Sequence, residues 1–378
     1  MEQDSTISKL LENFRSTPEN LKIFKNLKEY CKLSNDWGKL ADVYSIRANN
    51  ILNSDPKESG KLFFKQAQCL EKFLNQSVQA LEAYIKAWKT NKSSLEYFKT
   101  AIELAKGLKQ WQTYLELLKE RLEESKNNAE KVQLLLKIGV CFKNQLQDVE
   151  QAKIYLHQAL KLGDLNAQVV KNLESIYLEE KAWSSLLELY QIEAQKNTAK
   201  NKKIAKLEQC IQICKEKLND NSKAIDFAKE IIKIAPDHLK TFKELELLYS
   251  QKEDWKKLEA VMVKQLDLVD NNDEKVKILR RIALVWTEKL DNLEKAIKYY
   301  EKAFKIKEDP LILDILEESY SFLEDWKNLV RIYQKQSELS NNKEIIVSKY
   351  CSLGKIYSQK LQQTAKAIGW YKKALEES

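Results

Sequence analysis

Tryptophan marks a column of positions that recurs along the chain at almost constant intervals. The column comprises Trp37, Trp111, Trp183, Trp255 and Trp326, separated by steps of 74, 72, 72 and 71 residues. An apolar or aromatic side chain follows each tryptophan after three residues and again after seven, as Leu258 and Met262 follow Trp255. Such spacings place all three side chains on one face of an α-helix. The column therefore predicts one amphipathic helix in each period.

Alanine marks a second column with the same period. Its members are Ala80, Ala152, Ala224, Ala296 and Ala367. Thirteen residues before each alanine stands a position that is usually small, occupied in turn by Ala67, Gly139, Ile211, Ala283 and Gly354. Small residues at fixed places let two helices approach closely, and the large side chains between them fill the remaining space. Each period therefore predicts two antiparallel helical hairpins, one of each type.

Composition supports a purely helical array. The 378 residues include only seven glycines and four prolines, where average usage would give roughly 26 and 19. Such a chain is expected to have few tight turns and few of the Gly- and Pro-containing turns that separate β-strands. Asn and Asp fall in the breaks within the hairpins, at Asp148, Asp220 and Asn292 for example. There they are expected to accept hydrogen bonds from the first free N–H groups of the next helix.

The alanine-column hairpins resemble the tetratricopeptide repeat. Gly354 and Tyr357, followed by Ala367, Tyr371 and Ala374, stand where that family has its small and aromatic positions. The tryptophan hairpins fit less well and look like a degenerate second repeat type. The resemblance implies an all-α, right-handed α-solenoid of stacked antiparallel helical hairpins, with about 20 helices.

The repeat pattern also predicts the organisation of the chain. Residues 19–378 are expected to form one continuous array, and residues 1–18 an N-terminal extension with room for a short helix. The pattern stops as a helix closes, at Ala374, and no polar capping helix follows it, although solenoids usually need one. The chain is therefore expected to be a segment of a longer array, or to associate through its uncapped C-terminal hairpin.

Charge and targeting signals favour a cytoplasmic protein that has no membrane span and does not take nucleic acid as its partner. The net charge is +8, but only six of the 64 basic residues are arginine, the residue that nucleic-acid readers prefer. Lysines interleaved with glutamates are typical of solvated helix faces. There is no apolar run long enough for a membrane span, and the six scattered cysteines are read as reduced thiols.

No residue cluster in the sequence indicates catalysis, a cofactor or a metal. Cys210 and Cys214 lie four residues apart on one predicted helix, but both occupy columns of apolar residues, so we read them as core side chains. His157 and His238 are the only histidines and belong to no metal-binding motif. The tryptophan and tyrosine columns could stack nucleic-acid bases. Their constant period and helix face favour a core role instead.

The remaining hypothesis is a non-catalytic scaffold for protein–protein interactions. In the family that the chain resembles, the first helix of each hairpin lines a concave surface, which binds a partner segment. Offsets from the small column place the following residues there: Gln68, Lys72, Lys143, Asn144, Gln212, Lys215, Glu216, Arg280, Glu288 and Lys355. Plain solvated helix faces are the competing interpretation of these residues. An RNA-processing scaffold of the half-tetratricopeptide type is the alternative function.

Overall fold

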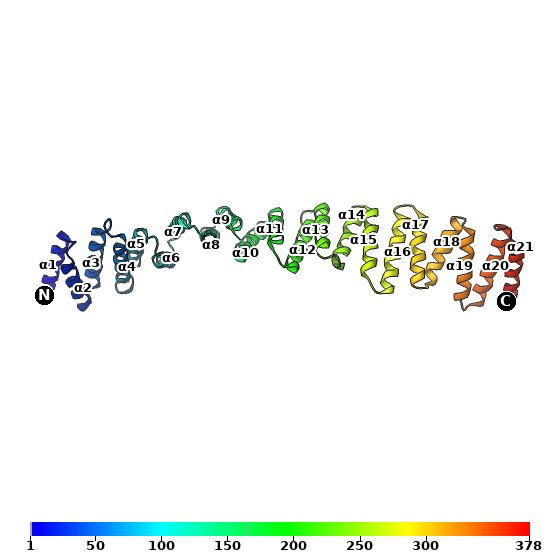
Figure 1. Cartoon of the computed structure of the whole chain (residues 1–378), viewed down its shortest axis with the longest axis horizontal. Helices are drawn as coiled ribbons and strands as arrows, with labels where there is room; N and C mark the ends of the chain where they lie inside the picture. Colours follow the sequence, from blue (N-terminus) through cyan, green and yellow to red (C-terminus); the bar gives the residue numbers. More distant parts are fainter. Residues whose placement is uncertain (1, 164) are drawn as a thin grey trace. The chain divides into compact units, whose positions relative to one another are not determined.

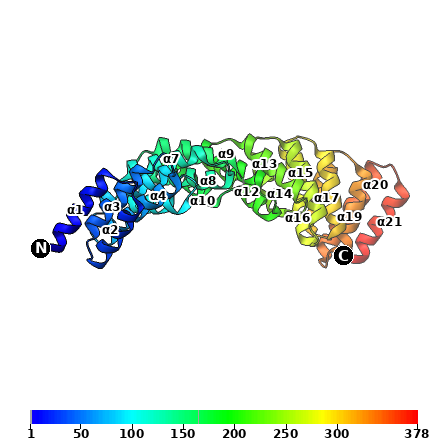
Figure 2. The same ribbon diagram turned by 60° about the vertical axis from the view of Figure 1, so that its left-hand side comes forward.

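The computed structural model describes residues 2–163 and 165–378, with side chains from Ile7 onward. Regular structure within these ranges consists of 21 helices and no strands. The expected all-α class is thus confirmed. The chain divides into two compact units, Met1–Ala182 and Trp183–Ser378. Within each unit, successive helices lie side by side, as Figures 1 and 2 show from two directions.

The first unit contains ten helices. They are α1 Glu2–Ser16, α2 Leu21–Leu33, α3 Trp37–Asn50, α4 Pro56–Lys72, α5 Ser77–Thr90, α6 Leu95–Gly107, α7 Trp111–Glu124, α8 Asn128–Asn144, α9 Val149–Leu162 and α10 Ala167–Glu179.

The second unit contains eleven helices. They are α11 Trp183–Lys196, α12 Lys200–Glu216, α13 Asn221–Ile234, α14 Leu239–Gln251, α15 Trp255–Leu268, α16 Asn272–Glu288, α17 Leu293–Ile306, α18 Pro310–Phe322, α19 Trp326–Leu339, α20 Lys343–Gln359 and α21 Thr364–Glu377.

Two kinds of hairpin alternate, and helix length distinguishes them. The first helix has 13 residues where the second begins with the column tryptophan, as in α14–α15. It has 17 residues where the second helix carries the alanine column, as in α16–α17. The second helix has 14 residues in both kinds. We call them short and long hairpins. The longer first helix has about one additional turn. One short and one long hairpin together make up the 72-residue period.

Every hairpin turns through a residue in the left-handed region, and none of these residues is glycine. Each stands two positions before the second helix of its hairpin. The ten are Asn35, Asn75, Lys109, Gln147, Lys181, Asn219, Glu253, Asp291, Glu324 and Gln362, with φ between 46° and 56°. Asparagine and aspartate tolerate this conformation, whereas Lys, Gln and Glu carry a steric penalty there.

The residue that follows the left-handed position joins the two helices. The Asp254 N–H donates to the Tyr249 carbonyl of α14 at 3.0 Å, while its carboxylate accepts from the Lys257 N–H of α15. Asp148, Asp220 and Asn292 likewise accept from the N–H three residues onward, so these predicted caps are confirmed. One residue thus satisfies orphan groups at both helix ends, the first through its backbone N–H and the second through its side chain.

The predicted alanine column forms the core of the long hairpins. All five alanines are at most 2 % exposed. Opposite them, the small column brings the two helices close. A Cβ atom added at Gly139 would lie 2.8 Å from Leu156 Cγ, and one added at Gly354 would lie 2.7 Å from Tyr371 Cε1. The size of the residue at this column therefore sets how closely the two helices approach.

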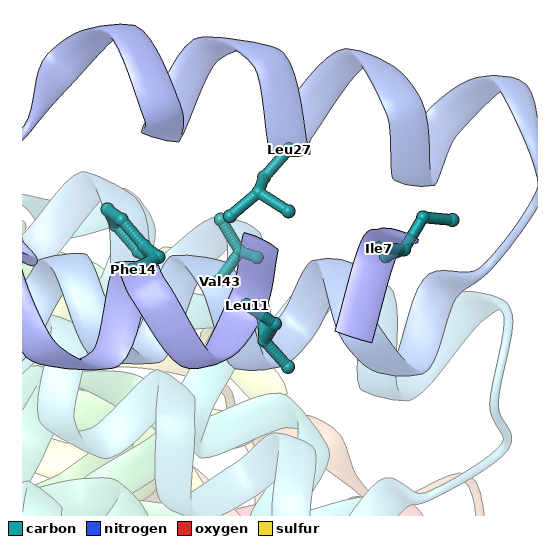
Figure 3. Close-up of a cluster of buried hydrophobic side chains, with 5 residues drawn as sticks. All are labelled: Ile7, Leu11, Phe14, Leu27 and Val43. Carbon is teal, nitrogen blue, oxygen red and sulfur yellow. The ribbon is translucent and has the colours of Figure 1, made fainter. Parts of the chain in front are cut away.

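Helix α1 extends the packed core at the start of the first unit. Its side chains Ile7, Leu11 and Phe14 are buried with Leu27 of α2 and Val43 of α3, as Figure 3 shows. Their spacings of four and three residues form a single apolar stripe on α1. Helix α1 therefore packs on the array by the same principle as the helices of the hairpins.

Candidate partner-binding grooves

The predicted partner-binding residues lie on the first helices of the long hairpins. Gln68 and Lys72 are on α4, Lys143 and Asn144 on α8, Gln212, Lys215 and Glu216 on α12, Arg280 and Glu288 on α16, and Lys355 on α20. Each unit therefore carries its own subset. The structure brings together the three residues of α12, which line one groove, and places Glu288 in a second groove described below.

Three of the predicted cations have acidic partners within the array. Lys143 Nζ donates to Ser175 Oγ at 2.8 Å and lies 3.3 Å from Glu179 Oε1, both on α10. Lys215 Nζ lies 2.6 Å from Glu244 Oε2 on α14. Likewise Arg280 pairs with Asp309, the N-cap residue of α18, at 3.7 Å. These side chains therefore tie neighbouring hairpins together, a role that neither sequence interpretation included.

A polar groove of about 490 Å³ lies between α12 and α14. Gln212, Lys215 and Glu216 form its α12 wall, with Lys240 and Glu244 on the α14 wall. Two ion pairs cross it, one between Lys215 and Glu244 and the other between Lys240 and Glu208 at 2.9 Å. The charges of these walls are therefore largely compensated, and an incoming segment would have to compete with existing ion pairs.

A second groove, of about 600 Å³, lies between α14 and α16 on the other side of α14. We call it the Trp255 groove. Trp255 of α15 lines it, together with Leu247 of α14 and Leu284 of α16, and the buried Leu258 and Met262 of α15 form its floor. Leu247 is 47 % exposed and Leu284 is 45 % exposed. The groove thus offers half-exposed leucine side chains to a ligand, which the polar groove lacks.

Charged side chains complete the lining of the Trp255 groove. Lys243, Arg281 and Lys289 contribute positive charge, and Glu246 and Glu288 negative charge. Glu246 is only 6 % exposed, and its Oε2 accepts a hydrogen bond from the Arg281 guanidinium. Its buried Oε1 has no hydrogen-bond partner among the described residues. An unsatisfied buried carboxylate oxygen is costly, which makes Glu246 the one lining residue that needs a further donor.

The two grooves open on the same face of the second unit. Gln209, Gln212 and Glu216 line the polar groove, and Arg281, Leu284 and Glu288 stand 72 residues later on α16 in the Trp255 groove. One period of separation places them at equivalent positions of their hairpins. We call the surface made by α12, α14 and α16 the first-helix face. A further groove of this unit, of about 480 Å³, is lined mainly by the second helices α17 and α19, so the use of the first helices stays a prediction.

Sequence reasoning missed the Trp255 groove except for Glu288, although one signal pointed to it. Leu247 is the apolar exception in its column, whose other members are Glu29, Glu103, Ser175 and Glu318. An exposed leucine where the other repeats have polar residues suggests an interaction surface. The orphaned oxygen of Glu246 had no such signal, because hydrogen-bond satisfaction depends on the tertiary structure.

The tryptophan column is not a fully buried core, and this part of the sequence interpretation needs correction. All five column tryptophans are half-buried. Three of the rings are covered by the lysine that stands at the C-cap of the first helix of the next hairpin. The distance from the lysine Nζ to the ring centroid is 5.3 Å for Lys217 over Trp183, 5.6 Å for Lys289 over Trp255 and 4.6 Å for Lys360 over Trp326. At the equivalent place Phe73 stacks on Trp37, with ring centroids 3.8 Å apart. The rings do lie between successive hairpins, as expected, but each stands at the start of its helix and so stays partly exposed.

Cys210, Cys214 and the two histidines are held by burial or by contacts with neighbouring side chains. Cys210 and Cys214 are fully buried, as their apolar columns predicted. Burial raises the pKa of the Cys210 thiol to about 12, which holds it in the unreactive neutral form. His238 Nδ1 lies 2.8 Å from Thr241 Oγ1 at the start of α14, and His157 Nε2 contacts the Tyr177 hydroxyl. Across the described ranges, no three His, Cys, Asp or Glu side chains are grouped closely enough to hold a metal ion.

Stacked antiparallel hairpins define each unit as part of an α-helical repeat protein. Three segments, residues 133–162, 288–310 and 312–345, match models of the tetratricopeptide repeat. The chain therefore contains tetratricopeptide repeats, as the resemblance in its sequence predicted. The third segment includes all of α19 and most of α18, so one of the short hairpins also matches the family. No described helix is long and apolar enough to cross a membrane.

Comparison with other proteins adds several distant neighbours. No curated protein sequence matches the chain. A structure of Naa15/Naa10 bound to HypK-THB is 12 % identical, with 98 % of this chain and 68 % of that chain covered and a TM-score of 0.32. YrrB, a TPR protein with an unusual peptide-binding site, is 17 % identical, with coverages of 52 % and 95 % and a TM-score of 0.29. PilF of Pseudomonas aeruginosa is 15 % identical, with coverages of 65 % and 99 % and a TM-score of 0.29. At such low TM-scores, no conclusion about this chain rests on these neighbours.

Proposed function

We propose that the protein is a non-catalytic scaffold that binds a segment of a partner protein on the first-helix face of its second unit. The observation that carries the proposal is the pair of grooves on either side of α14, with volumes of about 490 and 600 Å³. A segment that crosses α14 can use both. The polar groove offers charged and amide side chains, and the Trp255 groove offers half-exposed apolar ones. This division suits a partner segment with one apolar anchor and polar neighbours.

An affinity experiment with matched variants tests the proposal. The tagged full chain is used as bait in an extract of its source cells, beside the variant Leu247→Lys/Leu284→Lys. Both leucines are half-exposed, so the substitutions should leave the fold intact while placing charge in the groove. Leu311→Lys/Phe322→Lys is the control, because these residues are 60 % and 81 % exposed on α18 and line neither groove.

We expect a partner protein to bind the wild type and the control but not the groove variant, with or without nuclease. Equal binding to all three proteins would contradict the proposed site. Binding that nuclease abolishes, with RNA recovered, would instead support the half-tetratricopeptide alternative. Few arginines and the ion pairs already formed by the lysines favour the protein partner. A cytoplasmic location stays a prediction from the sequence.

Self-association through the C-terminal hairpin α20–α21 is a second proposed interaction. Ile368, Tyr371 and Leu375 of α21 are 52 %, 38 % and 77 % exposed and lie on one helix face, whereas Ile297 and Tyr300, the equivalents of the first two on α17, are buried. An apolar stripe of this kind favours association. We expect sedimentation velocity to show concentration-dependent dimers that Ile368→Glu/Leu375→Glu abolishes. A wild-type monomer at all concentrations would contradict it.

A further inference from the structure

Within the proposed function, the chemistry of the Trp255 groove narrows the kind of segment that fits. The buried Glu246 Oε1 lacks a donor, while Glu246 Oε2 already accepts from Arg281. The carboxylate charge is therefore compensated, and the missing partner is a hydrogen-bond donor and not a second cation. The Arg281 side chain is 55 % exposed, so a small shift of it can let a ligand group reach Oε1 while its hydrogen bond to Oε2 is kept.

The rest of the lining restricts the group that carries this donor. Trp255 is half-buried and Leu247 and Leu284 are half-exposed, and an aromatic ring packs well against such apolar side chains. Lys243, Arg281 and Lys289 exceed Glu246 and Glu288 by one positive charge, which disfavours a cationic ligand and favours acidic neighbours. A tyrosine side chain combines an apolar body with a hydroxyl donor at its tip.

We propose that the Trp255 groove binds an acidic partner segment through a tyrosine side chain, whose ring packs beside Trp255 and whose hydroxyl donates to Glu246 Oε1. The half-exposed leucines at positions 247 and 284 flank the ring. Lys243 and Lys289 face acidic residues next to the tyrosine. The groove thus accepts tyrosine in preference to phenylalanine, because phenylalanine would leave Oε1 buried without a donor.

Selection of peptides from a random library tests this inference even while the natural partner is unidentified. A phage library of random dodecapeptides is selected on the immobilised full chain, and the enriched peptides are synthesised. We expect tyrosine with flanking Asp or Glu to dominate. By fluorescence anisotropy, Tyr→Phe in the peptide should weaken binding to the wild type about tenfold, the loss expected when a buried acceptor stays unpaired. Against Glu246→Leu, which offers the hydroxyl no hydrogen-bond partner, the same peptide change should weaken binding by less than about threefold.

The outcomes separate the inference from the proposed function. Basic peptides, peptides without an aromatic residue, or no enrichment at all would overturn the inference. So would Tyr→Phe changes that leave the affinity for the wild type unchanged. Peptides that still bind Leu284→Lys occupy another site, in which case the scaffold function survives and the tyrosine groove fails. If the extract experiment also yields no partner, the scaffold function fails as well. Circular dichroism checks that Glu246→Leu and Leu284→Lys remain folded.

Discussion

Gly354 of α20 faces the ring of Tyr371 on α21 so closely that a Cβ atom at position 354 would lie 2.7 Å from Tyr371 Cε1. Gly139 has the same relationship to Leu156, at 2.8 Å from Cγ. The two contacts stand three periods apart. They differ in freedom, because Tyr371 is 38 % exposed whereas Leu156 is fully buried. The size tolerated at the small column therefore depends on whether the facing side chain has room to move.

The first prediction follows from this difference. Gly139→Ala should destabilise the first unit by about 1–2 kcal/mol, because the buried Leu156 cannot move away and overpacking outweighs the helix propensity gained. Gly354→Ala should be close to neutral, because the Tyr371 ring can turn toward solvent. Thermal unfolding followed by circular dichroism measures both. Equal shifts in the two variants would show that the close approach does not limit these sites.

Left-handed residues at the hairpin turns supply the second prediction. Glu253 has φ of 56°, a conformation that glycine adopts without steric cost. We expect Glu253→Gly to stabilise the protein by about 0.5–1 kcal/mol in urea unfolding. Lys264→Gly is the control, since Lys264 lies exposed inside α15 and should lose about 1 kcal/mol. A loss at both positions would mean that position 253 gains nothing from a left-handed preference.

Ion pairs between first helices supply the third prediction. A double-mutant cycle on Lys215 and Glu244, with alanine at each position, should give a coupling energy of about 0.5–1 kcal/mol that decreases in high salt. The exposed pair Lys229–Asp226 within α13 serves as the comparison and should give less. Zero coupling at low salt would show that Lys215 behaves as a solvated side chain and does not stabilise the stacking of α12 on α14.

Half-burial of the tryptophan column gives the fourth prediction. Trp255→Ala should cost about 2 kcal/mol, less than the 3–5 kcal/mol expected for a fully buried tryptophan. Lys289→Met removes the covering cation while keeping much of the side chain, and should cost about 0.5–1 kcal/mol. Chemical unfolding of the two variants measures both values. A loss above about 4 kcal/mol for Trp255→Ala would restore the core interpretation of this column.

Thiol chemistry gives the fifth prediction. Five cysteines are buried and Cys351 is exposed. Burial raises the pKa of Cys210 to about 12, so between pH 7.5 and 9 that thiol stays protonated as well as inaccessible. We expect a chromogenic disulfide reagent at pH 8 to titrate one thiol per native chain and all six after unfolding. Cys351→Ser should remove the native reaction. More than one rapidly reacting thiol in the native wild type would show that a buried cysteine becomes accessible.

The sequence by itself determined the repeat and most of the core. The alanine column, its partner columns and the caps at Asp148, Asp220 and Asn292 could be read from spacing alone, because helical periodicity and capping are local properties of the chain. The resemblance to the tetratricopeptide repeat implied that the first helices form the binding surface, and the spacing placed the candidate residues on them. It could not distinguish a free lysine from a paired one, since the acidic partners lie 29 to 36 residues away, as for Lys215–Glu244 and Lys143–Glu179.

The tertiary structure alone decided which face carries usable grooves and what they require. Trp255 repeats like a core residue, yet its position at the first turn of α15 leaves it half-buried beside a groove. The turns adopt a left-handed conformation at Lys109, Lys181 and Glu253 without a glycine to announce it, because the packing of both helices imposes it. Glu246 looks like any helical glutamate in the sequence. Only the contact with Arg281 and the burial of its second oxygen make it a candidate for recognition, because burial and pairing arise when neighbouring hairpins stack.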